Sequence, residues 1–196
     1  MDYRDSSDPD LVGLCKRGDE RAAAELLRRF ERPVFSLIYR MVRDRELAED
    51  LAQEAFVRAF NNLARYDPSF KFSSWLFKVA YNLTIDHLRK KRLDTISIHG
   101  SPSAVTREAQ AATAIALESP DERPDDELIS REIGSEIELA IGELREEYRS
   151  VIILRHLEGR SYEEISEIMD VPLGTVKTYI HRARKELQDQ LQHLLS

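Results

Sequence analysis

Apolar residues recur at helical spacing along most of this 196-residue chain, and this constrains its fold more than any other feature. The stretch 46–63 shows it most clearly, because Leu or Ala stands at every fourth position from Leu47 to Leu63. Such a repeat forms one apolar stripe on an α-helix, whereas a half-buried strand needs strict alternation, which persists nowhere in this sequence. The pattern therefore predicts an all-α protein.

The helical pattern falls into two blocks. Pro33 suits a first helical turn and is poorly tolerated in a helix interior, so we expect a new helix to begin there. Ser73 is expected to cap a long helix that ends near residue 92. Helical spacing then returns from about residue 126. The expected N-terminal helices span 20–30, 33–43, 46–63 and 73–92.

The segment between the blocks has the composition of a linker. Residues 96–132 contain three prolines and carry a net charge of −5, although an Ala-rich helix could form over 107–117. The sequence thus predicts two small helical domains, over 1–95 and 133–196, joined by a flexible acidic linker over 96–132.

Composition excludes several classes of protein. Hydrophobic residues make up 42% and charged residues 33%, which argues against collagen, low-complexity and disordered chains. The longest apolar runs fall far short of the roughly 18 residues of a membrane span, and the polar N-terminus does not resemble a secretory signal. The single Cys15 excludes an internal disulfide and a cysteine-built metal site. We expect a cytoplasmic protein with no membrane insertion, metal or cofactor.

Charge is distributed unevenly. The chain carries −7 in total, yet residues 20–95 carry +4, and residues 171–185 contain four basic residues and no acid. Such local charge is typical of a nucleic-acid footprint. Solvated helix faces would explain it equally well.

Residues 161–187 have the pattern of a helix-turn-helix. Ser161 and Glu164 form a capping box that begins a short helix, and Pro172 suits the start of a longer basic one. The second helix would enter the major groove and present the polar residues Thr175, Lys177, Thr178, His181, Arg182 and Lys185. The alternative is an ordinary helical hairpin with a charged outer face.

Aromatic residues concentrate between positions 66 and 81, which hold six of the chain's fifteen. Rings interleaved with cations suit single-stranded nucleic acid, because bases stack on rings and cations follow the backbone. We expect the loop 66–72 to be exposed and Trp75 or Phe77 to pack inside. The candidate contacts are Tyr66, Phe70, Lys71, Phe72, Lys78 and Arg89. An aromatic core beside a basic helix end is the alternative.

These residues resemble the extracytoplasmic-function (ECF) class, group 4 of the sigma-70 family of bacterial RNA polymerase sigma factors. Residues 44–56 (DRELAEDLAQEAF) are similar to region 2.2, and residues 75–89 (WLFKVAYNLTIDHLR) to regions 2.3 and 2.4. Residues 161–165 (SYEEI) and 171–177 (VPLGTVK) are similar to region 4. The family often has Ala where Ser166 stands and Gly where Asp170 stands, but Asp tolerates a left-handed turn.

The resemblance implies an alternative sigma factor, not an enzyme. Region 4 would read the −35 element, and regions 2.3 and 2.4 would open and read the −10 element, with Asn82 and the loop before Trp75 as readers. Its implied partners are RNA polymerase core (β′ clamp helices and β flap), promoter DNA and an anti-sigma factor, and the free chain would be a monomer. An acidic group on 46–54 suits a basic partner, and the polymerase contacts would be Glu49, Asp50, Gln53 and Glu54.

Two other functions remain open on the residues alone. A repressor or activator could use the same helix-turn-helix, but such proteins usually dimerise to match two half-sites, and no sustained dimerisation seam is visible. An enzyme is disfavoured, because the five histidines are scattered without metal-ligand spacing and no Gly-rich phosphate loop occurs.

Overall fold

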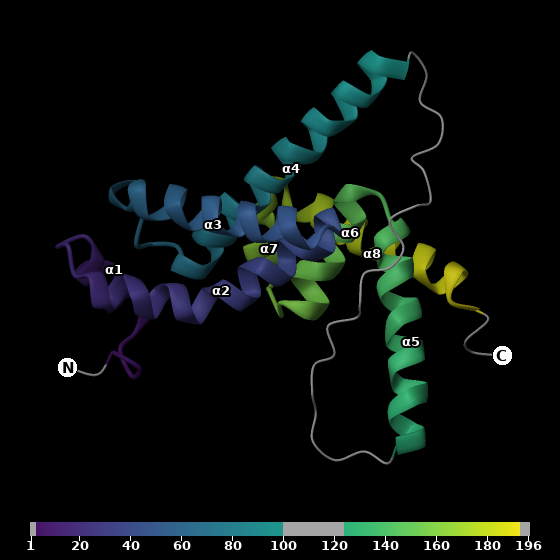
Figure 1. Ribbon diagram of the computed structural model, residues 1–196, viewed down its shortest axis with the longest axis horizontal. Coiled ribbons are helices and arrows are strands. Elements are labelled where there is room, and N and C mark those ends of the chain that lie inside the picture. Colours follow the sequence, from purple (N-terminus) through teal and green to yellow (C-terminus); the bar gives the residue numbers. More distant parts are fainter. Residues whose placement is uncertain (1–2, 100–123, 193–196) are drawn as a thin grey trace.

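The computed structural model describes residues 3–99 and 124–192, and the side chains of 3–93 and 134–192. This part of the chain is helical and contains no strand, as expected (Figure 1). Of the flexible linker predicted over 96–132, residues 96–99 and 124–132 are helical; the remainder, with the helix predicted over 107–117, lies outside the described residues. The elements are α1 (Asp8–Cys15), α2 (Glu20–Val42), α3 (Arg45–Asn61), the 3₁₀ turn η1 (Leu63–Arg65), α4 (Phe72–His99), α5 (Pro124–Glu143), α6 (Glu146–Ile152), the π-helical η2 (Ile153–Leu157), α7 (Tyr162–Met169) and α8 (Leu173–Gln190).

In the N-terminal domain, formed by α1–α4, helix α2 is continuous. The prediction of a new helix at Pro33 is wrong, because α2 runs from Glu20 to Val42 with Pro33 inside it. Proline removes one backbone hydrogen bond, but Phe30 and Val34 on either side of it are buried in the core. Burial of the apolar face on both sides offsets the lost bond and holds the helix together.

Helices α3 and α4 pack against α2 and complete this domain. Helix α3 buries the predicted stripe, including Leu51, Ala55 and Ala59, and leaves its acidic face exposed. Ser73 does not cap α4, because the helix begins one residue earlier at Phe72. The Ser73 hydroxyl is buried and instead accepts a hydrogen bond from Arg160 Nη1 at 3.0 Å.

In the C-terminal domain, formed by α5–α8, α7 and α8 form the predicted helix-turn-helix. The capping box is present, since the Glu164 N–H donates to Ser161 Oγ at 3.1 Å and the Ser161 N–H donates to Glu164 Oε2 at 2.8 Å. Asp170 ends α7 in the left-handed conformation, with φ +58°. Ser166 Oγ donates to the Val171 carbonyl at 2.6 Å, so these two residues hold a tight turn.

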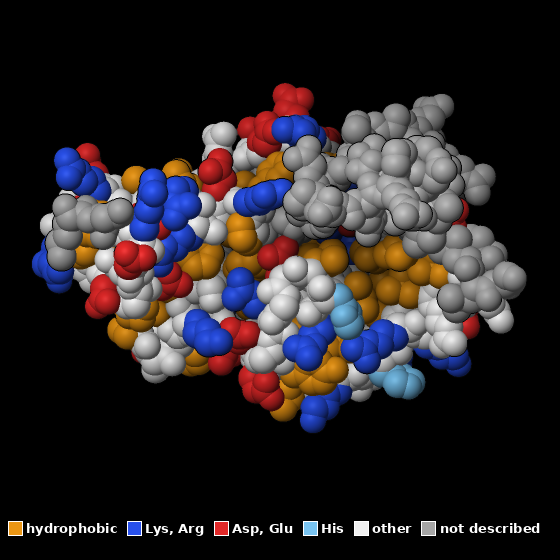
Figure 2. Space-filling view, turned by 90° about the horizontal axis from the view of Figure 1, so that it is seen from below, with side chains coloured by type: hydrophobic (Ala, Val, Ile, Leu, Met, Phe, Trp, Pro, Cys, Tyr) orange, Lys and Arg blue, Asp and Glu red, His pale blue; other side chains and the backbone are white. Residues whose placement is uncertain are grey.

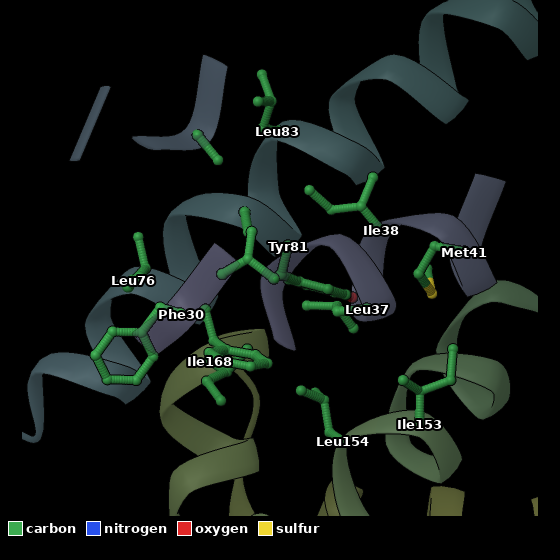
Figure 3. Close-up of a cluster of buried hydrophobic side chains, with 14 of the residues drawn as sticks. Phe30, Leu37, Ile38, Met41, Leu76, Tyr81, Leu83, Ile153, Leu154 and Ile168 are labelled. Carbon is green, nitrogen blue, oxygen red and sulfur yellow. The ribbon is translucent and has the colours of Figure 1, made fainter. Parts of the chain in front are cut away.

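The two domains are packed against each other, which the sequence did not predict. Figure 3 shows Phe30 and Leu37 of α2 and Tyr81 of α4 in one cluster with Leu154 of η2 and Ile168 of α7. All five side chains belong to a single buried hydrophobic core. In the described part of the chain, no helix is long and apolar enough to cross a membrane.

Candidate nucleic-acid and protein interfaces

A pocket of about 320 Å³ opens between α3 and α4 on the surface of the N-terminal domain. It combines cations, amides and one indole with a single carboxylate. Of the predicted site residues, it contains Asn82. Its lining residues are Arg58, Asn62, Arg65, Trp75, Val79, Asn82, Leu83 and Asp86.

The composition of this pocket suits an unstacked base. The half-buried Trp75 offers a stacking surface, the exposed Asn82 amide can donate to and accept from a base edge, and Arg58 and Arg65 can approach phosphates. Arg58, Arg65 and Asn62 were not among the contacts predicted from the sequence. Helical spacing could have predicted the side of the pocket that α4 forms, because Trp75, Val79 and Asn82 are spaced four and three residues apart and so lie on one face of a helix.

The loop 66–72 exposes one aromatic ring, not three. The predicted exposure of Tyr66 and Phe72 is wrong, because these rings are only 4% and 3% exposed, whereas Phe70 is 47% exposed. Tyr66 and Phe72 pack edge to face with ring centroids 5.7 Å apart, and both contact Trp75. The Tyr66 hydroxyl donates to the Phe70 carbonyl at 2.6 Å, so the buried rings hold the loop that presents Phe70. Phe77 is fully buried, as expected.

Two of the three predicted cations near this loop are paired with the C-terminal domain. Lys71 Nζ lies 3.0 Å from Glu164 Oε1, and Lys78 Nζ lies 3.1 Å from Asp170 Oδ1. Arg89, further along α4, is exposed. The pairing places acidic groups where nucleic-acid phosphates were expected.

The four predicted polymerase contacts lie together on the exposed face of α3. Glu49 pairs with Arg45 at 2.9 Å and Glu54 with Arg58 at 2.5 Å. Asp50 and Gln53 lie between these pairs and are exposed. Val57, which is 58% exposed, stands one helical turn further on. This face combines carboxylates with one apolar side chain, as a protein-binding surface often does.

Helix α8 presents most of its predicted contacts to solvent. Lys177, Thr178, His181, Arg182 and Lys185 are exposed, whereas Thr175 is only half-buried. Val176, Ile180 and Ala183 are buried and fix the opposite face of α8 against its own domain. In Figure 2, basic and histidine side chains lie together toward the lower edge of the view.

A histidine outside the predicted set adjoins α8. Arg184 Nη2 lies 3.2 Å from His156 Nε2. Burial lowers the pKa of His156, and the neighbouring Arg184 and Arg155 guanidinium groups lower it further. A neutral imidazole can therefore accept from Arg184 and hold this side chain near the basic face. Among the described residues, no group of three His, Cys, Asp or Glu side chains could hold a metal ion.

Comparison with known proteins agrees with this arrangement. Residues 26–93 match the family model of Sigma-70 region 2, and residues 135–187 match that of Sigma-70, region 4. The chain is 38% identical over 186 residues to the ECF RNA polymerase sigma factor SigW of Bacillus subtilis, covering 93% of this chain and 96% of SigW. It is 33% identical over 190 residues to the RNA polymerase sigma-H factor of Pseudomonas aeruginosa, covering 96% of this chain and 95% of that factor.

Solved structures share the fold. CnrH, in complex with the cytosolic domain of CnrY, superposes with a TM-score of 0.66 at 22% identity, over 95% of this chain and 97% of CnrH. The sigma factor RpoE of Bartonella quintana, in complex with the anti-sigma factor NepR, gives a TM-score of 0.67 at 21% identity, over 86% of this chain and 96% of RpoE. Both domains, their order and near full-length similarity to curated sigma factors lead to one conclusion: the chain belongs to the ECF class of sigma-70 family RNA polymerase sigma factors, and it directs RNA polymerase to promoters.

Proposed function

We propose that this sigma factor divides promoter recognition between its two domains. The domain over 1–95 binds polymerase core and captures the −10 element, the domain over 133–196 reads the −35 element, and 96–132 connects them. One observation carries this proposal. The pocket that holds Trp75 and Asn82 shares a small domain with the acidic face of α3, so a polymerase bound at α3 would lie beside captured DNA.

In the −10 contact, one base of the opened strand enters the pocket between α3 and α4. Asn82 reads its edge, Trp75 stacks against it, and Arg58 and Arg65 contact the flanking phosphates. Phe70 offers a second stacking surface on the neighbouring loop, and Arg89 follows the backbone along α4. Tyr66 and Phe72 act indirectly, because their buried rings hold Phe70 in place.

The free energies of duplex opening and base stacking indicate that this domain captures opened DNA but does not open it alone. Opening about 12 base pairs costs roughly 1.4 kcal/mol per step, or on the order of 15 kcal/mol. Stacking returns about 1–3 kcal/mol per captured base, so one or two bases return roughly 2–6 kcal/mol. The polymerase core must supply most of the remainder. The sigma factor therefore nucleates opening and sets its register, and the core performs the chemistry.

In the −35 contact, α8 lies in the major groove. Of the exposed predicted contacts, Lys177, Thr178 and His181 lie nearest the helix start and reach base edges, whereas Arg182 and Lys185 contact bases or phosphates. Thr175 lies at the first turn of the helix and approaches the phosphate backbone there.

The proposed contact with the polymerase is a protein interface held mainly by electrostatic attraction. Glu49, Asp50, Gln53 and Glu54 on α3 face the β′ clamp helices, and the C-terminal domain binds the β flap. The sigma factor works in the cytoplasm, binds core as a monomer and needs no cofactor of its own. Because RpoE of Bartonella quintana was solved with the anti-sigma factor NepR, we propose that an anti-sigma factor also covers the polymerase-binding faces of this chain.

The test is reconstitution with bacterial core RNA polymerase. Co-elution with core and discrete run-off transcripts from a genomic fragment library are expected. Asp50→Arg inverts a charge in the proposed contact and is expected to weaken core binding, measured by co-elution, at least tenfold. The control Glu31→Arg makes the same charge change at an exposed position of α2, away from the proposed contact, and is expected to leave core binding unchanged. Equal core binding by both variants would remove the α3 assignment. Specific duplex binding by the chain alone, with no core binding, would favour a conventional helix-turn-helix regulator.

A further inference from the structure

The π-helical turn η2 stands directly before the helix-turn-helix and presents two basic side chains on its outer side. The Glu158 N–H closes this turn on the Ile153 carbonyl at 3.0 Å. Ile153 and Leu154 are fully buried, whereas Arg155 is half-buried and His156 is exposed. Short π-helical turns are rare and frequently occur at functional sites. The wide turn thus fixes its apolar side in the core and presents its basic side to solvent.

Helix α8 brings a third basic side chain to this turn. Arg184 Nη2 lies 3.2 Å and Arg184 Nε lies 3.4 Å from His156 Nε2. Arg184 follows Lys177 by seven residues and His181 by three, so these three side chains share one exposed face of α8. Lys177 and His181 are proposed −35 contacts. The basic cluster of Arg155, His156 and Arg184 therefore extends the proposed DNA-binding face of α8 onto a neighbouring element.

The charges that act on the His156 ring are positive. Burial lowers the pKa of His156, and the guanidinium groups of Arg184 and Arg155 lower it further, so the ring is neutral near pH 7 in the free chain. Arg155 is held in place by the Arg160 carbonyl, to which its Nη1 donates at 2.9 Å, and by the Tyr162 ring, whose centre lies 5.0 Å away. Like charges gathered in this way repel one another, and a bound anion would remove the repulsion.

The other charged groups on the elements around η2 face partners of their own. Hydrogen bonds from its own backbone and from Ser161 lower the pKa of Glu163 on α7, and the charges of Lys177 and Arg155 lower it further. The remaining pairs are Glu158 with Ser36 Oγ of α2 at 2.9 Å, Arg40 of α2 with Glu138 at 2.9 Å, Arg149 of α6 with the Met41 carbonyl at 2.8 Å, and Arg160 with Ser73 Oγ at 3.0 Å. An anion is therefore the ligand that the basic cluster favours.

We propose that the basic cluster of Arg155, His156 and Arg184 anchors a backbone phosphate of duplex DNA beside the −35 contact. The phosphate replaces the contact between Arg184 and the neutral ring. Arg184 then donates to the phosphate oxygens, and the ring takes up a proton from solvent so that His156 Nε2 donates as well. The proposal rests on the −35 role of α8 proposed above. It adds a contact from η2 and makes DNA binding depend on proton uptake.

The direction of the pH dependence follows from the two states of the ring. In the free chain the pKa of His156 lies below its ordinary value of 6.5, whereas a phosphate beside the ring raises it. DNA binding therefore takes up a proton at pH values between the free and the bound pKa. Affinity is expected to rise as the pH falls through the bound pKa. Above that pKa, the anchor consists of the two arginines alone.

The test removes the charge of the ring but keeps its contact with Arg184. In His156→Gln, the side chain still offers an acceptor to the guanidinium but cannot be protonated. The matched control is His87→Gln, which removes a histidine of α4, outside the −35 contact. Binding of the full chain to a labelled duplex of about 25 base pairs and mixed sequence is measured by fluorescence anisotropy over a series of salt concentrations. A phosphate contact needs no particular base sequence, so this probe is sufficient.

His156→Gln is expected to bind about three- to tenfold more weakly than the parent chain at about pH 6, and equally at about pH 8. At the lower pH, loss of one phosphate contact is also expected to reduce the slope of log affinity against log salt by about 0.9. Burial raises the pKa of Glu158, but this group titrates in the parent and in both variants, so the comparison cancels its effect. Equal affinity of His156→Gln and the parent at both pH values overturns the proposal. So does a loss that is the same at both pH values, or an equal loss in His87→Gln.

Proton NMR of the histidine rings separates failure of the anchor from failure of the proposed function. The signals of His156 and His181 are assigned by their absence from His156→Gln and His181→Gln and are followed against pH with and without the duplex. The pKa of His156 is expected to rise when the duplex binds. If the duplex shifts the His181 signal and leaves the pKa of His156 unchanged, only the anchor is wrong. If neither signal responds, the anchor is wrong, and run-off transcription with core polymerase shows whether the −35 role of α8 fails with it.

Discussion

Arg149 is the side chain whose loss is expected to cost this fold most through polar contacts. Its Nη1 donates to the Met41 carbonyl at the end of α2 at 2.8 Å, and its Nη2 donates to the carbonyls of Gly142 at 2.6 Å and Leu144 at 2.9 Å. One guanidinium thus ties the N-terminal domain to the turn between α5 and α6. Burial lowers the pKa of Arg149, and the nearby Arg43 lowers it further, so desolvation offsets part of this gain.

Arg149→Met keeps most of the apolar stem and leaves three carbonyls without their donor. Hydrogen bonds to a charged group contribute about 1.5–3 kcal/mol each, so the three together contribute roughly 4.5–9 kcal/mol before the desolvation cost. A net loss of about 3–5 kcal/mol is expected, as found when one member of a buried charged contact is removed. That loss is a large share of the roughly 5–15 kcal/mol by which native proteins are stable.

The assay is urea unfolding followed by circular dichroism, with the free energy of unfolding obtained by linear extrapolation. Arg145→Met is the control, because Arg145 is mostly exposed and pairs with Glu147 at 3.0 Å. Its loss is expected to cost less than about 1 kcal/mol. Equal stability of the two variants, or a free energy of unfolding of Arg149→Met within about 1 kcal/mol of the parent chain, would contradict this role of Arg149.

Three further predictions concern the two promoter contacts and one carboxylate of α2. Phe70→Ala removes the exposed ring of the loop, so open-complex formation by the polymerase holoenzyme, followed by permanganate reactivity, is expected to fall at least fivefold while core binding is unchanged. Lys177→Ala with Arg182→Ala is expected to abolish −35-dependent run-off transcription and leave co-elution with core intact; normal transcription would contradict the assignment of α8. Hydrogen bonds from Arg28 and then Arg29 lower the pKa of Glu25 from 4.5 to about 2. Glu25 therefore stabilises the fold above pH 4.5 and loses this effect as the pH falls toward 2, so Glu25→Gln is expected to lower the melting temperature at pH 7 but not near pH 2.

Elements whose signals are local could be predicted from the sequence. The four-residue repeat fixed the buried face of α3 and, by elimination, the exposed one that carries Asp50 and Gln53. The capping box at Ser161 and the proline at 172 located the helix-turn-helix to within a residue or two. In both cases, neighbours along the chain determine the structure, so spacing alone suffices.

Features that depend on tertiary packing could not be predicted. Pro33 was expected to break a helix, but burial of its neighbours on α2 keeps the helix continuous. Tyr66 and Phe72 were expected to be exposed, but both pack with Trp75, and Phe72 also packs with Phe30 of α2, more than forty residues earlier in the chain. Composition could show that aromatic rings gather there, but not which of them the fold exposes.

The packing of the two domains against each other bears on the order in which core polymerase and promoter DNA bind. Lys71, one residue before α4, and Lys78 within α4 would attract free DNA, yet they are paired with the carboxylates of Glu164 and Asp170. The whole chain carries −7, so the free protein is also repelled by duplex DNA at long range. The exposed acidic face of α3 lies outside these pairs and stays open to a basic partner. Core polymerase is therefore expected to bind at α3 before promoter DNA reaches the lysines that lie against the C-terminal domain.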